Sequence, residues 1–320
     1  MERKKSTHKV EVVPVLMRAH PNADSLSIVD VFGYTVCVRT EDWKSVPLGA
    51  YIVPDSIVPD TDTFAFLKGQ RRIKVKRLRG VVSQGLLIPA PDGAVAGDDV
   101  AELLGVTRYD PPMPISSGGE AIAPPGGIHP TYDVDSWYRF KHLFIEGEEV
   151  TATEKIHGAS ARFVWQDEQM FCGSRSEWKR EEEKNLWWRA ARETEGLLEF
   201  CKANPEITVY GEVYGRVQDL HYGTKPGEVR FVAFDLLRKG QWISFEEAQE
   251  LGKGLPWVPL LYRGPYNEQK MLALADGKTT MPGADHVREG IVVKPIIERT
   301  DPEIGRVLLK IVSNAYLERA

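Results

Sequence analysis

Glu154-Lys155-Ile156-His157-Gly158-Ala159-Ser160 is the stretch that decides the fold of this 320-residue chain. It follows a segment, Glu149 to Thr153, whose alternation is typical of a β-strand, and its small residues predict a turn. A lysine there could attack a phosphate, provided that desolvation or a neighbouring cation such as a bound metal favours the neutral amine. Gly158 would let the backbone pass close to a nucleotide. Alone, a Lys-x-x-Gly turn is more often a solvated strand end, so the other segments must decide.

The composition is that of an ordinary globular protein, with 42% apolar residues, 27% charged residues and a net charge of -5. The length predicts about two domains. No run approaches the ~20 apolar residues of a membrane span, and the amino terminus lacks the apolar core of a signal peptide. We therefore expect a cytoplasmic protein with no membrane partner. Cys37, Cys172 and Cys201 lack a paired metal-type spacing, which indicates packing residues in a reducing compartment.

Residues 1–106 are predicted to form an all-β domain, because short apolar strands alternate with Pro, Gly, Asn and Asp turn signals. The expected strands are Val10 to Leu16, Leu26 to Phe32, Tyr34 to Val38, Tyr51 to Val53, Ile73 to Leu78 and Gly85 to Ile88. A small barrel is the natural closure for strands of this length.

One segment of this domain, Lys68 to Arg79, holds seven basic residues in twelve. Ile73 and Val75 can face the core while their neighbours point outward, which gives a basic outer face suited to a phosphate backbone. The alternative is an edge strand that uses lysine to avoid aggregation. Because we find no acidic partner in the segment, we favour nucleic-acid binding by Lys68, Arg71, Arg72, Lys74, Lys76, Arg77 and Arg79.

Residues 107–130 are rich in proline and glycine and are predicted to be an interdomain linker that forms no regular ladder. In residues 131–320 strands and helices alternate. We expect one helix from Glu177 to Cys201, with its tryptophans in the core, and further helices capped by Ser244 and Asn267. The expected strands are Ile207 to Val213, Val229 to Leu237, Ile291 to Lys294 and Val307 to Ile311.

Polar residues recur inside or beside these apolar strands, and charges in such places need partners. In chain order they are Ser174, Arg175, Glu212, Asp235, Glu289, Lys294 and Lys310. A nucleoside triphosphate with a divalent metal would satisfy all of them, with carboxylates for the metal waters and a ribose hydroxyl, and cations for the phosphates. Each could instead be an ordinary ion pair within a strand, but together they favour a nucleotide site.

Two sets of motifs resemble known families. Ala19-His-Pro-Asn-Ala-Asp-Ser-Leu26 and Leu78-Arg-Gly-Val-Val-Ser-Gln-Gly-Leu86 resemble the oligonucleotide-binding (OB) barrel of tRNA-binding modules and of deinococcal-type RNA ligases. Lys155-Ile-His-Gly158, followed in order by the polar strand residues, resembles the motif series of covalent nucleotidyltransferases. Glu-Lys-Ile-His-Gly-Ala is similar to the RNA ligase 2 class, since DNA ligases usually carry Asp at the position of His157.

The resemblance implies an α+β protein, in which an OB-like barrel precedes a nucleotidyltransferase (ATP-grasp-like ligase) domain of antiparallel sheets and helices. It implies an ATP-dependent ligase that uses Mg²⁺ or Mn²⁺ and acts, as a monomer, on nicked duplexes with RNA on the 3′-hydroxyl side. Lys155 would form lysyl-AMP, which passes AMP to a 5′-phosphate before a 3′-hydroxyl seals the strand.

The same resemblance implies roles for the other residues. His157 would assist near the leaving pyrophosphate, and Lys294 and Lys310 would neutralise phosphate charge. Arg175 would contact ribose or the nick phosphate, Glu212 the ribose and a metal, and Glu289 the water shell of the metal. Phe234 would stack on adenine, with Glu154 and Asp235 also beside the nucleotide. The family often has Lys-x-Lys in its last motif, so which of the two Lys310 represents stays open.

Two alternatives remain: a non-catalytic RNA-binding protein with this fold, and a DNA ligase. DNA ligases and capping guanylyltransferases normally carry their barrel after the last motif, whereas here ten residues follow Lys310. The barrel at the front therefore favours an RNA ligase.

Overall fold

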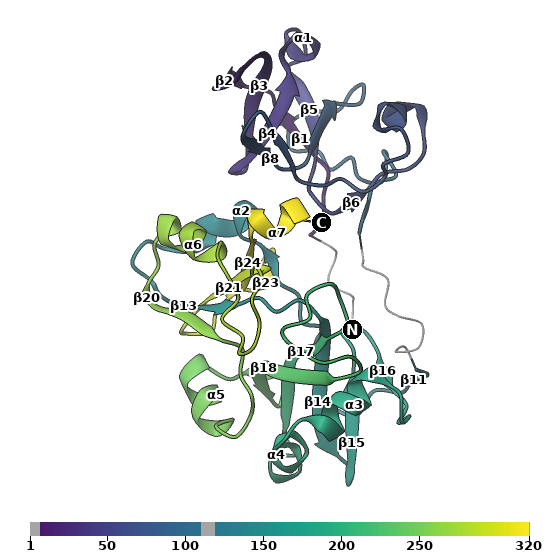
Figure 1. Cartoon of the computed structure of the whole chain (residues 1–320), viewed down its shortest axis with the longest axis vertical. Helices are drawn as coiled ribbons and strands as arrows, with labels where there is room; N and C mark the ends of the chain where they lie inside the picture. The colour runs from purple at the N-terminus through teal and green to yellow at the C-terminus, as the bar shows by residue number, and fades with distance from the viewer. Residues whose placement is uncertain (1–6, 110–118, 320) are drawn as a thin grey trace. The chain divides into compact units, whose positions relative to one another are not determined.

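The computed structural model of the chain describes residues 7–109 and 119–319. The chain divides into two compact units, whose described residues are 7–109 with 314–319 in the first and 119–313 in the second (Figure 1). Each unit has its own buried apolar core. Within the two described ranges, no helix is long and apolar enough to cross a membrane.

The first unit is built from short antiparallel strands, as its turn signals predict. They are β1 (Glu11–Pro14), β2 (Met17–His20), β3 (Ala23–Val31), β4 (Tyr34–Arg39), β5 (Leu48–Ile52), β6 (Ser56–Ile57), β7 (Lys76–Leu78), β8 (Val81–Ser83), β9 (Leu86–Pro89) and β10 (Thr107–Arg108). The strand orders are β1-β5-β9, β2-β3-β4, β7-β8 and β10-β6. The unit also holds α1 (Thr40–Trp43), the 3₁₀ helix η1 (Asp62–Leu67) and α7 (Asn314–Arg319).

The basic segment alternates between buried and exposed residues as predicted. Ile73 and Val75 lie in the core while Lys74 and Lys76 are exposed. Only Lys76 to Leu78 of the predicted strand forms a ladder, with β8 as its partner. The segment before it is extended and is tied to the unit by backbone bonds of Ile73 to Ser56 and Asp55.

The second unit contains two larger sheets. The first sheet has the order β11-β16-β15-β14-β17-β18-β19 and the second has the order β12-β24-β21-β13-β20. The strands of the first are β11 (Ala121–Ile122), β14 (Ala159–Gln166), β15 (Gln169–Gly173), β16 (Trp178–Lys179), β17 (Ile207–Gly215), β18 (Val229–Arg238) and β19 (Gln241–Trp242). Those of the second are β12 (Asp135–Ser136), β13 (Glu149–Glu154), β20 (Leu260–Pro265), β21 (Gly290–Pro295) and β24 (Leu309–Val312).

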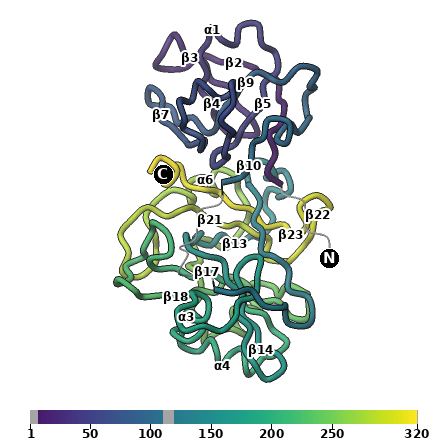
Figure 2. Tube along the Cα trace, turned by 90° about the vertical axis from the view of Figure 1, so that its right-hand side faces the viewer, coloured from purple at the N-terminus to yellow at the C-terminus, as the bar shows by residue number. Residues whose placement is uncertain are grey.

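Helices pack on one face of each sheet in the second unit. They are α2 (Trp137–Phe140), η3 (Lys141–Leu143), α3 (Leu186–Glu193), α4 (Leu197–Ala203), α5 (Phe245–Leu251) and α6 (Glu268–Ala275), with a small hairpin of β22 (Thr300–Asp301) and β23 (Gly305–Arg306). Figure 2 traces the chain from β13 to β14, where it leaves one sheet and enters the other. The two sheets therefore meet at the Lys155 turn.

The single helix predicted from Glu177 to Cys201 is wrong in extent. Its first part contains β16, and the rest is split into α3 and α4 at Gly196, which has a φ of +77°. Helix α3 ends before Thr194, whose backbone is extended, and Gly196 is the N-cap of α4. The prediction for the tryptophans is confirmed, because Trp187 and Trp188 are buried and their ring N–H groups donate to the carbonyls of Ser160 and Lys179.

The predicted linker, residues 107–130, is also more ordered at its ends than expected. Thr107–Arg108 pairs with β6, and Ala121–Ile122 pairs with Trp178–Lys179. Two-residue ladders can form beside the prolines because they need few backbone donors. The segment Pro111 to Pro114 lies outside the described residues, and the domain boundaries remain a prediction.

The predicted caps and cysteines can also be compared with the structure. The side chain of Asn267 caps α6 through the N–H of Lys270, whereas Ser244 precedes α5 without a side-chain cap. All three cysteines are free thiols, and Cys172 and Cys201 pack in the core beneath the seven-stranded sheet. The expected role as packing residues is confirmed for Cys172 and Cys201, whereas Cys37 is partly buried.

Candidate active site

The Lys155 turn lies at the junction of the two large sheets. It begins where β13 ends, in the five-stranded sheet, and β14 then enters the seven-stranded sheet. The N–H of Lys155 donates to the carbonyl of Gly290, 3.0 Å away, which places the lysine beside Glu289 at the start of β21. Side chains from both sheets can therefore converge on the lysine.

Gly158 is required here for a reason different from the expected approach of a nucleotide. A Cβ on this residue would lie 2.1 Å from the carbonyl oxygen of Val213 in β17. Its N–H donates to Oε1 of Glu212 at 3.0 Å. The missing side chain thus lets the turn approach β17 and fixes the Glu212 carboxyl beside it.

Lys155 is bonded to the expected metal ligand. Its Nζ lies 2.7 Å from Oε1 of Glu289, and this carboxylate is buried. Burial raises the pKa of Glu289, but Lys155 and His157 outweigh burial and hold that pKa at about 2. The carboxylate is therefore ionised at neutral pH, and it holds the lysine at the junction.

His157 is fixed from three directions. Its Nε2 lies 2.9 Å from Oδ1 of Asp219, and its Nδ1 lies 3.5 Å from Oε2 of Glu289. Its backbone N–H donates to the hydroxyl of Tyr222 at 2.7 Å. The ring is thus held between an exposed carboxylate and a buried one, on the side of the turn where Lys155 lies.

Glu212 has the opposite pKa behaviour from Glu289. Burial raises its pKa to about 8, with Glu289 adding to the rise, although Lys155 and the N–H of Gly158 act against it. Two close carboxyls thus differ, one ionised and one favouring its neutral form at pH 7. A cation placed between them would stabilise the ionised form of both.

The expected phosphate-binding lysines share one face of the five-stranded sheet. Ile291, Val293, Leu309 and Ile311 pack into the core on the other face. Alternation puts Lys294 and Lys310 on the face opposite to those residues. Lys310 is partly exposed and pairs in register with Val292, whereas Lys294 is 5% exposed.

Lys294 takes part in a buried ion-pair network centred on Asp235. Its Nζ is bonded to Oδ1 of Asp235, and Arg306 donates to Oδ2 of the same carboxylate at 2.8 Å. Burial raises the pKa of Asp235, but Arg306 and Lys294 outweigh burial and hold it at about 2. Arg306 also pairs with Glu298, its Nε lying 2.7 Å from Oε2. Asp235 thus joins β18 of one sheet to the strands of the other.

The expected base-stacking residue lies one position before Asp235. The register between β17 and β18 shifts there, since Tyr210 pairs with Asp235 and Gly211 with Ala233. Phe234 is the extra residue of this β-bulge, a feature that re-aims a side chain. Its ring remains partly exposed and lies 4.3 Å from the ring of Tyr132, between centroids.

The remaining two predicted nucleotide contacts are differently placed. Arg175 lies in the exposed turn after β15 and pairs with Asp133. Glu154 is buried, and its carboxylate accepts bonds from the hydroxyl of Thr279 and from the N–H and hydroxyl of Thr280, the last two at 2.8 Å. Its side chain therefore anchors the segment before β21, and its role beside the nucleotide stays a prediction.

The donor set fits a hard divalent cation. Glu289 Oε2 is buried and makes no hydrogen bond, although Nδ1 of His157 lies 3.5 Å away, and the charge of Glu289 contributes to the raised pKa of Glu212. Among the described residues no ready group of three or more His, Cys, Asp or Glu ligands is assembled. Mg²⁺ is usually bound through one or two carboxylates, with water and phosphate oxygens as the other ligands.

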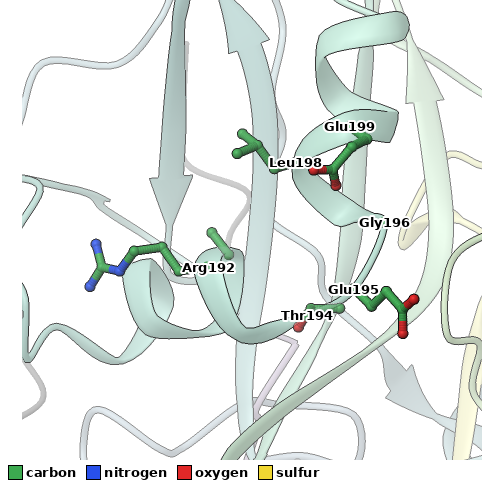
Figure 3. A pocket seen from close by; sticks show the side chains of 7 residues that line it. Arg192, Thr194, Glu195, Gly196, Leu198 and Glu199 are labelled. Carbon is green, nitrogen blue, oxygen red and sulfur yellow. The ribbon is translucent and has the colours of Figure 1, made fainter.

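A hollow of about 420 Å³ lies apart from these residues, between α3 and α4 (Figure 3). Arg192, Thr194, Glu195, Gly196 and Glu199 are among the residues that line it. It contains none of the predicted site residues.

In the first unit, two of the predicted basic residues have acidic partners, which corrects the expectation of an unpaired run. Arg72 pairs with Asp55 at 2.8 Å and lies over the ring of Tyr109, and Arg77 pairs with Glu318 at 2.6 Å. Sequence could not reveal these pairs because the carboxylates are distant in the chain. Among the described residues, Lys68, Lys74, Lys76 and Arg79 form no ion pair.

The two motifs of the OB resemblance meet in the first unit. The ring of His20 contacts the carbonyl of Leu78 at 3.2 Å and accepts the N–H of Asn22 at 3.1 Å. The amide of Asn22 donates to the carbonyl of Arg79 at 2.9 Å. Arg79 has a φ of +47° in the turn between β7 and β8. The first motif therefore holds the turn that presents Arg79.

Several residues of the site were not found from sequence. Asp219 and Tyr222 hold His157, the threonines hold Glu154, and Arg306 and Tyr132 hold Asp235. They lie outside the motif series and contact it only through the fold. One signal for these partners is present in the sequence: Asp235 is a charged residue inside an apolar strand and needs cations beside it, of which Lys294 was expected at the site and Arg306 was not.

Comparisons with known proteins agree with this geometry. The profile of the RNA ligase family matches residues 148–312, and an OB-fold domain profile matches residues 8–90. No curated protein matches the chain. The structure is similar to the Naegleria gruberi RNA ligase with PPi, at 26% identity over 98% of this chain and 99% of that chain, with a TM-score of 0.83. It is also similar to a mutant of that ligase with ATP and Mn, at 26% identity over 97% of this chain and 98% of that chain, with a TM-score of 0.82.

The fold and the site thus define an α+β protein in which an OB-fold domain precedes a ligase domain of antiparallel sheets and helices. The chain belongs to the RNA ligase family. The predictions of the family, the fold class and an RNA ligase enzyme are confirmed.

Proposed function

We propose that the chain seals 3′-hydroxyl/5′-phosphate nicks with ATP, through a lysyl-AMP intermediate and an adenylylated 5′ end. Lys155 Nζ forms a bond to the α-phosphorus of ATP, the bond to the β-phosphate oxygen breaks, and pyrophosphate leaves. A 5′-phosphate oxygen then takes AMP from the lysine. The 3′-hydroxyl attacks that 5′-phosphate, the phosphodiester bond forms, and AMP leaves.

One observation carries the proposal: Lys155 lies 2.7 Å from Glu289, in the turn that joins the two sheets and beside Glu212 and His157. The turn supplies the amine and His157, and two other segments supply Glu212 and Glu289. Neighbouring structures are complexes of an RNA ligase with ATP and Mn, with AMP and Mn, and with PPi. These are the nucleotides and the leaving group that the three steps require.

The residues have distinct tasks in this scheme. Glu289 and Glu212 would hold a divalent cation or its waters, and that cation would neutralise charge on the attacked phosphate. His157 would contact the leaving pyrophosphate. Lys294 and Lys310 would stabilise the charge that shifts between phosphate oxygens, Lys294 from its buried pair with Asp235. Phe234 would stack on adenine and Arg175 would contact ribose or the nick phosphate.

The partner would be a nicked duplex with RNA on the 3′-hydroxyl side. Lys68, Lys74, Lys76 and Arg79, which are exposed and form no ion pair within the described part of the chain, support backbone binding by the OB-fold unit. Arg71 is exposed beside them, with its Nε bonded to the carbonyl of Val58. We propose that the enzyme acts as a monomer in the cytoplasm.

The test is labelling with ATP carrying a labelled α-phosphate, followed by sealing of a panel of nicked duplexes that differ in which strand is RNA. We expect covalent label on wild type and sealing with RNA on the 3′-hydroxyl side. A protein that binds nicked RNA but takes no label would be a non-catalytic RNA-binding protein. Equal sealing of all-DNA nicks would indicate a DNA ligase.

A further inference from the structure

Residues 129–133 lie along the face of the seven-stranded sheet that carries the site. The carbonyl of His129 accepts a bond from Arg162 at 2.7 Å, and the carbonyl of Pro130 accepts one from the hydroxyl of Tyr210 at 2.9 Å. Asp133 pairs with Arg175. The segment is thus tied to β14, to β17 and to the turn after β15, so Tyr132 has a fixed place.

Tyr132 occupies a box of aromatic and charged groups. Its ring centroid lies 4.3 Å from that of Phe234, 5.5 Å from that of Trp242 and 5.8 Å from that of Tyr210. Its hydroxyl donates to Oδ2 of Asp235, the carboxylate that also binds Lys294 and Arg306. Burial, followed by the charge of Asp235, raises the pKa of the Tyr132 hydroxyl, which therefore stays a donor.

The ring of Phe234 depends on this contact because its backbone is irregular. A bulge residue is left out of the ladder, so its direction is set less by the sheet than by what packs against it. Tyr132 lies against the ring of Phe234 at an interplanar angle of 41°, while part of Phe234 remains exposed. The ring of Phe234 is thus supported by Tyr132, and the residue keeps some exposure to solvent.

We propose that Tyr132 is a positioning residue that holds Phe234 as the stacking platform for the purine of ATP. The proposal rests on the proposed function, in which Phe234 contacts adenine. The ring of Tyr132 supplies the support. Its hydroxyl fixes the ring to Asp235 and, through that carboxylate, to Lys294 on the other sheet.

The test measures KM for ATP and kcat of lysyl-AMP formation in the full-length protein. Tyr132→Leu removes the ring and should raise KM about 5- to 10-fold, the scale of an aromatic pair, with a smaller change in kcat. Tyr132→Phe keeps the ring but loses the bond to Asp235, so KM should rise less than in Tyr132→Leu. Tyr262→Leu is the matched control, since that tyrosine lies on β20 and its hydroxyl donates to the carbonyl of Pro265.

A double-mutant cycle with Phe234→Leu separates this proposal from the proposed function. If Tyr132 acts through Phe234, the double variant should have the KM of Phe234→Leu alone. The proposal would be overturned if the increases in KM of the two single variants add in the double variant, or if KM is unchanged in Tyr132→Leu. It would also be overturned if KM is lower in Tyr132→Leu, which would show that the tyrosine competes with the base. If Phe234→Leu has the KM of wild type and Lys155 still takes the label, Phe234 is not the stacking platform for adenine. The proposed ligase activity would be unaffected by that result.

If Tyr132→Leu does not fold, Tyr132→Met fills a similar volume without a ring and takes its place. The expected results and the contradicting ones are the same for this variant. Thermal melting of each variant shows whether it is folded before KM is compared.

Discussion

The Nζ of Lys155 lies 2.7 Å from Oε1 of Glu289, so the proposed nucleophile and the proposed metal ligand are already paired. Before ATP can be attacked, this pair must loosen and the amine must lose a proton. Binding of a divalent cation to the Glu289 carboxylate would favour both changes, because it competes with the ammonium for the same oxygens.

Lys155→Ala should abolish AMP labelling and the sealing of nicks that carry a plain 5′-phosphate. No other amine takes part in the proposed covalent intermediate. The measurement is transfer of label from ATP labelled at the α-phosphate. A nick that is already adenylylated is the control, since its sealing does not require a new lysyl-AMP and some activity should remain. Full labelling of the variant would refute the assignment of Lys155.

Glu289→Gln keeps the shape of the side chain but removes its charge. We expect at least one step to slow by about 10²-fold or more, the scale of one preorganised electrostatic contact. Single-turnover rates of lysyl-AMP formation and of sealing would locate the step. Raising the concentration of Mn²⁺ should restore part of the rate if the carboxylate holds the metal. A wild-type rate at low Mn²⁺ would show that Glu289 only pairs with Lys155.

The basic surface of the OB-fold unit, defined as Lys74, Lys76 and Arg79, should serve the nick and not ATP. Replacing all three by alanine should weaken binding to a nicked duplex and flatten its salt dependence, while AMP labelling stays near normal. The matched control replaces Arg18, Arg39 and Lys44 by alanine, which changes the net charge by the same amount. Each of these three residues is paired with a carboxylate in the same unit. If both triple variants lose the same affinity for the nicked duplex, the net charge of the unit, and not this basic surface, determines binding.

The sequence could predict the strand that precedes Lys155, the order of the polar residues and the basic alternation, because these depend on local period and composition. It could not predict the break between α3 and α4, where Thr194 is extended and Gly196 is left-handed although the helical period continues. Nor could it find the partners of Arg72 and Arg77, since Asp55 and Glu318 reach them only through the fold. Contacts between segments distant in the chain, such as Tyr132 with Phe234, have no sequence period at all.

Asn22 should affect nucleic-acid binding only through Arg79, whose carbonyl it holds. Asn22→Ala should weaken nick binding less than Arg79→Ala does, and the double variant should bind as Arg79→Ala alone. The measurement is the affinity for one nicked duplex and its dependence on salt concentration, taken for wild type, both single variants and the double variant. If the two losses add, Asn22 contacts the nucleic acid by itself or supports another residue.

Asp235 should make the stability of the ligase unit depend on acid pH. Its pKa in the folded protein is about 2, below the ordinary value of 3.8, so its stabilisation is complete above the unfolded pKa and is lost as pH falls through about 2. Asp235→Asn leaves Lys294 and Arg306 buried without their shared carboxylate and should cost about 3 to 5 kcal/mol near pH 7. The free energy of unfolding of wild type and of Asp235→Asn is measured with denaturant, and the difference between the two should become smaller below pH 4.

Asp285→Asn is the control, because Lys278 lowers the pKa of Asp285 but the pair is exposed to solvent and screened. A constant difference between wild type and Asp235→Asn from pH 7 to pH 3 would mean that the pKa of Asp235 is not lowered in the folded protein.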